Sequence, residues 1–229
     1  MSGIRLDGVT VRLGDADVLR DVAVDLDART VAVIGENGSG KSTFARLLGG
    51  LTPATAGRVE VLGLDPARQS AELRRRVAVV FSNPDAQIVL PTVAEDVAFS
   101  LRAEKPTRAE AAERVARALA RFGLTDLAER SSHDLSGGQK QLLALCGAFI
   151  RHPELVIADE PTAFLDARNA RRVADHLFAE EHGHRLVLVT HDLALAERCD
   201  VAVLFADGRV AGIGTPADIV AEYEASIRW

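Results

Sequence analysis

The sequence predicts an α/β protein with a mainly parallel sheet, an antiparallel β portion at the N-terminus and an inserted helical subdomain. The first observation is a set of short apolar runs separated by helical segments: Val31–Ile34, Val77–Phe81, Leu155–Ala158, Leu186–Val189 and Val201–Phe205. Continuous apolar strands that alternate with helices are typical of parallel sheets covered on both faces. The second is a glycine-rich stretch, Gly35–Ser42, between the first of these runs and a helix. The third is a long helical block that interrupts the alternation.

The elements around this core follow from local patterns. Residues 4–11 and 18–26 are expected to form two antiparallel strands joined by a turn at Gly14, and residues 58–62 a further strand. In the helical block, Thr92 and Thr107 are each followed three residues later by a glutamate, which predicts capping boxes, and Gly123 is a C-cap candidate. We therefore expect one domain over residues 1–229, with a core of 1–86 and 153–229 and a helical subdomain of about 87–152.

The stretch Gly35–Ser42 matches the pattern G-x-x-x-x-G-K-[ST] between a strand and a helix, which predicts a P-loop NTPase core. Glycines let the backbone approach a polyphosphate, and the loop amides and the helix N-terminus attract anions. We expect Lys41 to contact the β- and γ-phosphates of ATP and the Ser42 hydroxyl to bind Mg²⁺. The other expected nucleotide contacts are Gly35, Asn37, Gly38, Ser39, Gly40 and Thr43.

Two adjacent acids end the apolar run Leu155–Ala158. In P-loop proteins the second Mg²⁺ ligand is an acid at the end of a neighbouring strand, and Asp159 fits that role. Glu160 follows directly, where a carboxylate can orient or deprotonate a water that attacks the γ-phosphate. Without the P-loop, an ordinary acidic turn after a strand would explain these two acids. Because the chain also contains a P-loop, we expect the catalytic roles instead.

The run Leu135–Gln139, Leu-Ser-Gly-Gly-Gln, predicts a helix N-terminus with exposed amides. It forms a second anion site far along the chain from Lys41. Because one chain does not need two triphosphate sites, we expect a composite site in which Ser136, Gly137, Gly138 and Gln139 face the phosphate loop of a second chain.

These motifs together resemble the ATP-binding-cassette (ABC) ATPases, of which Leu-Ser-Gly-Gly-Gln is the signature. The resemblance covers the chain from about residue 3 to its end. It implies that Glu160 is the catalytic glutamate, that Asp166 is the aspartate of the D-loop and that His191 is the switch histidine. It further implies that two such domains bind two ATP head to tail, and that hydrolysis drives membrane-embedded transporter subunits. The second chain is either identical or a different ATPase.

The sequence departs from the family pattern at two positions. Leu13 stands where an aromatic residue usually stacks on adenine, and Ser82 stands where the Q-loop glutamine usually follows Val-Phe. Gln87 lies five residues after Ser82 and is the candidate substitute for the missing glutamine. The run Asn83–Gln87 resembles the ATPases of energy-coupling-factor (ECF) importers, a group that includes biotin, cobalt and nickel systems.

The composition of the chain limits the kinds of partner that we expect it to bind. The net charge is −6 and the pI about 5.6, which gives no basic surface for nucleic acid. The two cysteines, Cys146 and Cys199, have no metal-ligand spacing, and we expect buried free thiols. No signal peptide or membrane-length apolar run is recognised, so we expect a cytoplasmic protein docked peripherally on membrane subunits. Tyr223 and Trp229 are aromatic residues expected to pack on the core or on a partner chain.

The sequence predicts an Mg²⁺-dependent ATPase that powers import of a small nutrient, a vitamin such as biotin or a metal ion. Three other functions remain open. A non-transport ABC protein usually carries coiled-coil insertions or a second cassette, which this chain lacks. A nucleotide-binding regulatory module with little turnover is suggested by Leu13 and Ser82. A P-loop kinase would leave Leu135–Gln139 without a role.

Overall fold

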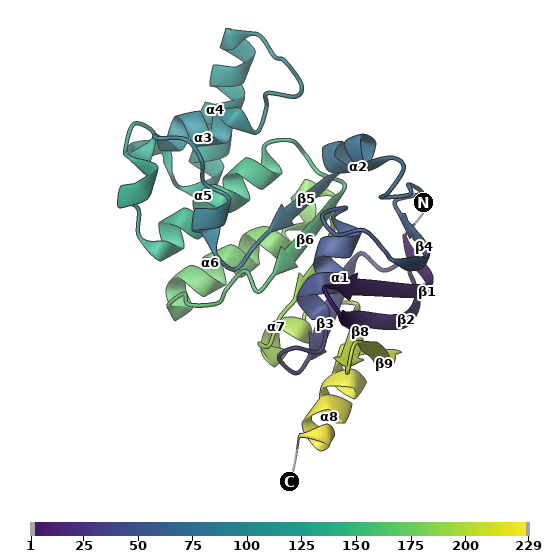
Figure 1. Cartoon of the computed structure of the whole chain (residues 1–229). Helices are drawn as coiled ribbons and strands as arrows, with labels where there is room; N and C mark the ends of the chain where they lie inside the picture. The colour runs from purple at the N-terminus through teal and green to yellow at the C-terminus, as the bar shows by residue number, and fades with distance from the viewer. Residues whose placement is uncertain (1–2, 228–229) are drawn as a thin grey trace. The chain divides into compact units, whose positions relative to one another are not determined.

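The structure, a computed structural model, describes residues 3–227 (Figure 1). The chain forms two compact units. The first contains the chain up to Val77, Glu154–Glu160 and the chain from His184 onward, and the second contains Ala78–Pro153 and Pro161–Gly183. Trp229, an expected packing residue, lies outside the described residues.

The first unit begins with a three-stranded antiparallel sheet in the order β2-β1-β4. Its strands are β1 (Ile4–Leu13), β2 (Ala16–Leu26) and β4 (Ala56–Val61). The expected antiparallel pair is confirmed, with its turn at Gly14, where φ is +59°. Alternating residues of β1 and β2 such as Val9 and Leu19 are completely buried, so one face of this sheet packs inward.

The larger sheet of this unit has the order β6-β7-β3-β8-β9. Its strands are β6 (Leu155–Asp159), β7 (Arg185–Val189), β3 (Thr30–Gly35), β8 (Val201–Ala206) and β9 (Arg209–Gly214). The first four run parallel, as their continuous apolar sequences predict, and β9 returns antiparallel to β8. Val189 pairs with Asp159 on one side and with Val33 on the other, so β3, β6 and β7 end at one edge of the sheet. Chain segments that carry polar residues therefore leave the sheet close together at that edge.

Four helices accompany these sheets: α1 (Lys41–Leu48), α2 (Ser70–Arg76), α7 (Leu193–Ala196) and α8 (Pro216–Ser226). Helix α1 packs on β6 and β7, and the rings of Phe44 in α1 and Phe205 in β8 lie 5.0 Å apart. Helix α8, drawn in yellow in Figure 1, packs on β8 and β9. Thr215 caps α8 by accepting a hydrogen bond from the Asp218 amide.

The second unit is mainly helical. Strand β5 (Val77–Val80) leads into it. Its helices are η1 (Pro84–Ala86), α3 (Val93–Phe99), α4 (Arg108–Phe122), η2 (Thr125–Leu127), η3 (Ser132–Asp134), α5 (Gly137–Phe149), α6 (Ala167–Phe178) and η4 (Glu180–His182). Both expected capping boxes are present, at Thr92 and Thr107, and Gly123 ends α4 with a φ of +66°. These local signals set the helix boundaries because they satisfy backbone groups that the helix ends leave open.

The compact units divide the chain differently from the expected boundaries. Residues 161–183, expected in the α/β core, group with the helical residues. Their contacts with α4 explain this: the His176 ring stacks on Phe122 at 4.2 Å, and Arg172 donates a hydrogen bond to the Phe122 carbonyl. Arg121 also forms an ion pair with Glu181. Among residues 3–227, no helix is long enough and apolar enough to cross a membrane.

Candidate functional site

The phosphate-loop stretch lies between β3 and α1, as its sequence predicts. At Gly35 the φ is +139°, and an added Cβ would lie 2.1 Å from the Phe205 carbonyl oxygen. At Gly40 the φ is +103°, and a Cβ would lie 2.8 Å from the Leu19 side chain. No other residue fits at either position without moving the backbone. The two glycines therefore fix the loop against β8 and β2, and Asn37 and Gly38 stand exposed between them.

Two polar side chains of the loop are buried. Lys41 is 6% exposed, and its ammonium group donates hydrogen bonds of 2.7 Å to the carbonyls of Gly35 and Glu36. Burial lowers the pKa of Lys41, while the carboxylates of Glu160 and Asp159 act against this shift. The buried Ser39 hydroxyl has no hydrogen-bond partner among the described residues. A buried cation beside an unpaired hydroxyl and open loop amides fits a bound polyphosphate. Thr43, also buried, lies on the first turn of α1.

Ser42 and Asp159 meet beside this loop although they are 117 residues apart in the sequence. The Ser42 hydroxyl donates a hydrogen bond of 3.0 Å to Asp159 Oδ1. Burial raises the pKa of Asp159, and the Ser42 hydrogen bond opposes that shift. A hydroxyl and one carboxylate are oxygen ligands that suit Mg²⁺ when the substrate phosphates supply the rest. The residues therefore fit the expected metal.

Glu160 and His191 form a second pair at the same sheet edge. His191 Nδ1 lies 2.7 Å from Glu160 Oε2, and the Glu160 backbone N–H donates to the Val189 carbonyl at 2.9 Å. Glu160 has a φ of +51°, an uncommon conformation for a non-glycine residue. Its side chain is 20% exposed, compared with 70% for His191. The strained backbone and the histidine together direct a partly buried carboxylate, as a positioned general base requires.

The expected signature residues lie in the helical unit. Ser136 caps α5 and forms a reciprocal capping box with Gln139, whose side-chain oxygen accepts from the Ser136 amide at 2.9 Å. Around Gly137 an added Cβ would meet nothing within 4 Å. At Gly138 it would lie 2.3 Å from the side chain of Asn169. The start of α5 is thus open on one side and closed by α6 on the other.

Asp166 caps α6 in the same unit. It accepts hydrogen bonds from the backbone and side-chain nitrogens of Asn169, at 3.0 and 2.6 Å, and these bonds hold the pKa of Asp166 below its usual value. Asn169 therefore connects Asp166 to the first turn of α5. Asn169 was not predicted from the sequence, although an Asp followed three residues later by Asn is a recognisable local signal.

In the structure the Gln87 side chain pairs with the backbone of its own segment. Its side-chain oxygen accepts from the Phe81 amide at 2.8 Å, and its side-chain nitrogen donates to the Val79 carbonyl at 2.9 Å. The amide that was expected to replace the missing Q-loop glutamine is thus paired with the backbone on both sides of Val80. Leu13, at the expected adenine position, ends β1 with 47% of its surface exposed.

Two further residues hold the same segment and were not anticipated. Gln141 on α5 is 1% exposed and donates to the Phe81 carbonyl at 3.1 Å. Lys140 forms an ion pair of 2.7 Å with Asp85 in η1. A glutamine on the apolar side of a helix needs a buried partner, which is the signal that would have identified Gln141.

Comparisons with known proteins identify relatives that match most of this chain. The family model described as "ABC transporter" matches residues 19–163. The biotin transport ATP-binding protein BioM of Rhizobium etli is 39% identical over 220 residues, which covers 96% of this chain and 97% of BioM. The energy-coupling factor transporter ATP-binding protein EcfA1 of Symbiobacterium thermophilum is 45% identical over 207 residues, covering 87% of this chain and 72% of EcfA1.

Two solved structures match the fold across almost the whole chain. The cbiO1 protein of Clostridium perfringens, part of the ABC transporter complex cbiONQ, has a TM-score of 0.84 and 30% identity, covering 97% of this chain and 92% of cbiO1. The ATP-binding cassette MJ0796, a dimer bound to ADP and Pi, has a TM-score of 0.83 and 28% identity, covering 93% and 98%. The phosphate loop and the two adjacent acids are the motifs of an ATPase, and the matches cover most of the chain. The chain therefore belongs to the ABC transporter family as an ATP-binding, ATP-hydrolysing domain.

Proposed function

We propose that this ABC ATPase hydrolyses Mg²⁺-ATP to power import of a small nutrient through separate membrane subunits of an ECF-type transporter. The observation that carries the ATPase part is the convergence of four side chains at one sheet edge. Ser42 contacts Asp159, and Glu160 contacts His191, within one compact unit. Each of these residues has a defined task in transfer of a phosphoryl group to water.

The loop residues bind and neutralise the triphosphate. Lys41 exchanges its two backbone carbonyl partners for β- and γ-phosphate oxygens, which are charged and therefore stronger acceptors. Ser42 and Asp159 would hold Mg²⁺, which would supply positive charge to the phosphate oxygens. The backbone amides of Asn37 to Thr43 supply the remaining donors at the N-terminus of α1.

Glu160 accepts a proton from the attacking water, which makes the water a better nucleophile. His191 holds the Glu160 carboxylate through its Nδ1 contact of 2.7 Å. Because His191 is 70% exposed, it also stands free to contact the γ-phosphate. Through His191, the orientation of the Glu160 carboxylate therefore depends on whether the γ-phosphate is present.

We propose that a second ABC ATPase chain completes each site. The open N-terminus of α5 at Ser136, Gly137, Gly138 and Gln139 provides amides for the γ-phosphate of the ATP bound by the partner. Asp166 lies in the adjoining loop, where Phe164 is 100% exposed. A large exposed aromatic side chain is typical of a surface that contacts another protein. The dimeric arrangement of MJ0796 supports this proposal.

The transport part rests on the segment Asn83–Gln87 and on the relatives. Asp85 in this segment is held by Lys140, and Gln87 closes the segment onto Val79 and Phe81. BioM is named for biotin transport and EcfA1 for an energy-coupling factor transporter. We therefore propose a peripheral subunit on the cytoplasmic face of the membrane. Its substrate is a vitamin such as biotin, or a metal ion.

A regulatory module with little turnover is the second candidate. Exposed Leu13 and short Ser82 favour it, and so does the pairing of both Gln87 side-chain atoms with the backbone. Steady-state phosphate release by the isolated chain and by its membrane complex separates the two functions. The transport function predicts release that rises when membrane subunits are present.

Affinity purification of the tagged chain from detergent-solubilised membranes tests the partner. The proposal requires a membrane-embedded subunit to co-purify and to restore nutrient uptake in cells only when Glu160 is intact. Recovery of the chain alone, or uptake that persists with Glu160→Gln, contradicts the transport function.

A further inference from the structure

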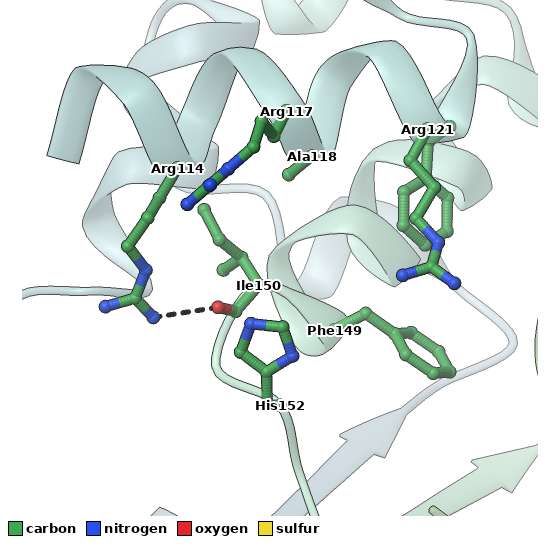
Figure 2. A pocket seen from close by; sticks show the side chains of 8 residues that line it. Arg114, Arg117, Ala118, Arg121, Phe149, Ile150 and His152 are labelled. Carbon is green, nitrogen blue, oxygen red and sulfur yellow. Dashed lines mark hydrogen bonds between the residues drawn. The ribbon is translucent and has the colours of Figure 1, made fainter. Parts of the chain in front are cut away.

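The helical unit contains a cavity of 350 Å³ between α4 and the end of α5, which we name the α4–α5 pocket (Figure 2). Three arginines from α4, Arg114, Arg117 and Arg121, form its charged lining, and His152 beyond α5 adds an imidazole ring. The residues that line it include no carboxylate. A helix pattern alone assigns these arginines to a solvated face. Figure 2 instead shows their guanidinium groups extending from α4 toward the end of α5.

The neighbouring contacts hold two of the arginines over the cavity. Arg114 is 22% exposed and donates to the Ile150 carbonyl at 2.9 Å, the dashed contact in Figure 2. It also pairs with Glu104, and Arg121 pairs with Glu181. These glutamates lie outside the lining. The two arginines are thus oriented without placing a negative charge inside the pocket.

Arg117 is the arginine that is available to a ligand. Its partner Glu113 lies at 3.2 Å on the same helix, and the two side chains are 70% and 68% exposed. An exposed pair of this kind is weak, so another carboxylate can replace Glu113 at little cost. A guanidinium group has five N–H donors in a planar fork that matches a carboxylate.

The other wall of the pocket is apolar. It is formed by Ala118 and by Phe149 and Ile150, each of which is 5% exposed. The half-buried His176 stacks on Phe122, and its pKa is lowered by burial and by the positive charges of Arg121 and Arg172. The pocket thus combines positive potential on one side with apolar surface on the other. Its volume is that of a small-molecule site rather than of a flat protein interface.

We propose that the α4–α5 pocket binds a small organic anion in which one carboxylate is joined to a short apolar chain or ring. The carboxylate lies on Arg117 with Arg121 beside it, and the apolar part lies on Ala118, Phe149 and Ile150. This site is separate from the phosphate loop and does not require the transport function proposed above. Inorganic phosphate satisfies only the charged half of the pocket, and an uncharged amphiphile only the apolar half.

Isothermal titration of the full chain with three probes tests this ligand chemistry. Saturating Mg²⁺-ADP is present throughout, so that the phosphate loop is filled. Octanoate carries both halves of the expected ligand, octanamide only the apolar half and inorganic phosphate only the charge. We expect saturable binding of one octanoate per chain, about tenfold or more tighter than either control, because a carboxylate on an arginine adds a charge-assisted contact. Equal affinity for octanamide or phosphate, or no saturable octanoate binding, overturns the proposal.

Variants locate the binding at this pocket. Arg117→Gln should weaken octanoate binding about fivefold to tenfold, because it removes one charged contact. Arg108→Gln, which changes an exposed arginine at the start of the same helix outside the lining, should leave the affinity unchanged. Ala118→Trp fills the cavity and should abolish octanoate binding, while circular dichroism confirms that each variant is folded. Octanoate binding that survives Ala118→Trp, or that falls equally with Arg108→Gln, places the ligand elsewhere and refutes the site.

Discussion

Gln87 and Gln141 hold the two sides of a single residue, Phe81. The Gln87 side-chain oxygen accepts from the Phe81 N–H at 2.8 Å, and the Gln141 side-chain nitrogen donates to the Phe81 carbonyl at 3.1 Å. Ser82, which stands at the position expected for the Q-loop glutamine, is the next residue along the chain. Its backbone position is therefore set by two glutamines, one of which lies on the helix that Ser136 caps. Movement of α5 would thus move the start of the Ser82 loop.

Replacing Gln87 tests whether it supports the loop or binds the nucleotide. Gln87→Ala removes the part-buried hydrogen bonds that its side chain makes with the Phe81 N–H and the Val79 carbonyl, each of which contributes ~0.5–1.5 kcal/mol. We expect the thermal unfolding midpoint to fall by roughly 3–8 °C. Gln69→Ala removes an exposed glutamine that accepts one hydrogen bond from Asp65 and should have almost no effect. An unchanged midpoint together with weaker Mg²⁺-ATP binding would instead assign Gln87 to the nucleotide.

Gly137 and Gly138 are neighbours with opposite surroundings, which gives a matched pair of variants. Gly138→Ala places a Cβ 2.3 Å from the Asn169 side chain and must break the bond between Asn169 and Asp166. Overpacking of this kind costs about 1–3 kcal/mol, so the unfolding midpoint should fall. Gly137→Ala meets no atom within 4 Å and should leave the midpoint unchanged or slightly raised. Equal effects of the two substitutions would show that α6 does not close the start of α5.

The cysteines provide a chemical test of burial. Cys146 and Cys199 are buried free thiols, as their apolar neighbours predicted, and burial raises the pKa of each to about 12. At pH 8 only a very small fraction of either thiol is ionised, and the thiolate is the reactive form. We expect an aromatic disulfide reagent to label neither cysteine in the native chain and both after denaturation. Rapid labelling in native buffer would contradict this packing.

The parts of the fold that the sequence predicted are those set by local signals. Continuous apolar runs located β3, β6 and β7, and capping patterns located α3, α4 and α5, because those signals act within a few residues. Strand β9 and helix α8 were missed, although the Thr215–Asp218 cap is a local signal of the same kind. The grouping of α6 with the helical unit depends on contacts between distant residues, such as the stacking of His176 on Phe122, which no window of sequence contains. Gln87 contacts residues only six and eight positions away, but no capping or turn pattern predicts that pairing.

In the candidate site too, local motifs predicted some residues, whereas others are recognised only from their contacts in the fold. The motifs identified Lys41, Ser42, Asp159 and Glu160 because phosphate and metal chemistry restricts both residue type and spacing. Asn169 and Gln141 were missed because their importance comes from what they contact. The role of His191 was expected only through the resemblance, and its pairing with Glu160 was not predicted, since 31 residues separate them and no spacing rule connects them.

The phosphate loop is tested by removing its cation. Lys41→Ala eliminates the buried ammonium group that now binds the Gly35 and Glu36 carbonyls. Charge-assisted hydrogen bonds contribute about 1.5–3 kcal/mol, so ATP affinity should fall at least roughly tenfold. Lys105→Ala, which changes an exposed lysine of the helical unit, is the control for a general charge effect. Unchanged nucleotide affinity in Lys41→Ala would refute the assignment of the phosphate loop.

Glu160→Gln tests the general base and the composite site together. The amide keeps the size of the side chain but loses the negative charge and the proton acceptor, so turnover should fall by a factor of about 10²–10⁴. ATP binding should persist because Lys41, Ser42 and Asp159 are unchanged. Hydrolysis at the parental rate would exclude Glu160 as the base.

If the sites are composite, uncleaved ATP in the Glu160→Gln variant should hold two chains together. Size-exclusion chromatography with Mg²⁺-ATP should then show a dimer that is absent without nucleotide. Adding Ser136→Arg should abolish this dimer, because a long cationic side chain fills the open N-terminus of α5 that faces the partner's ATP. Thr107→Arg removes the equivalent cap from α4 and costs similar helix stability, so it should leave the dimer intact. A slow variant that binds ATP but stays monomeric at all concentrations, also with its membrane subunits present, would show that each site is complete within one chain.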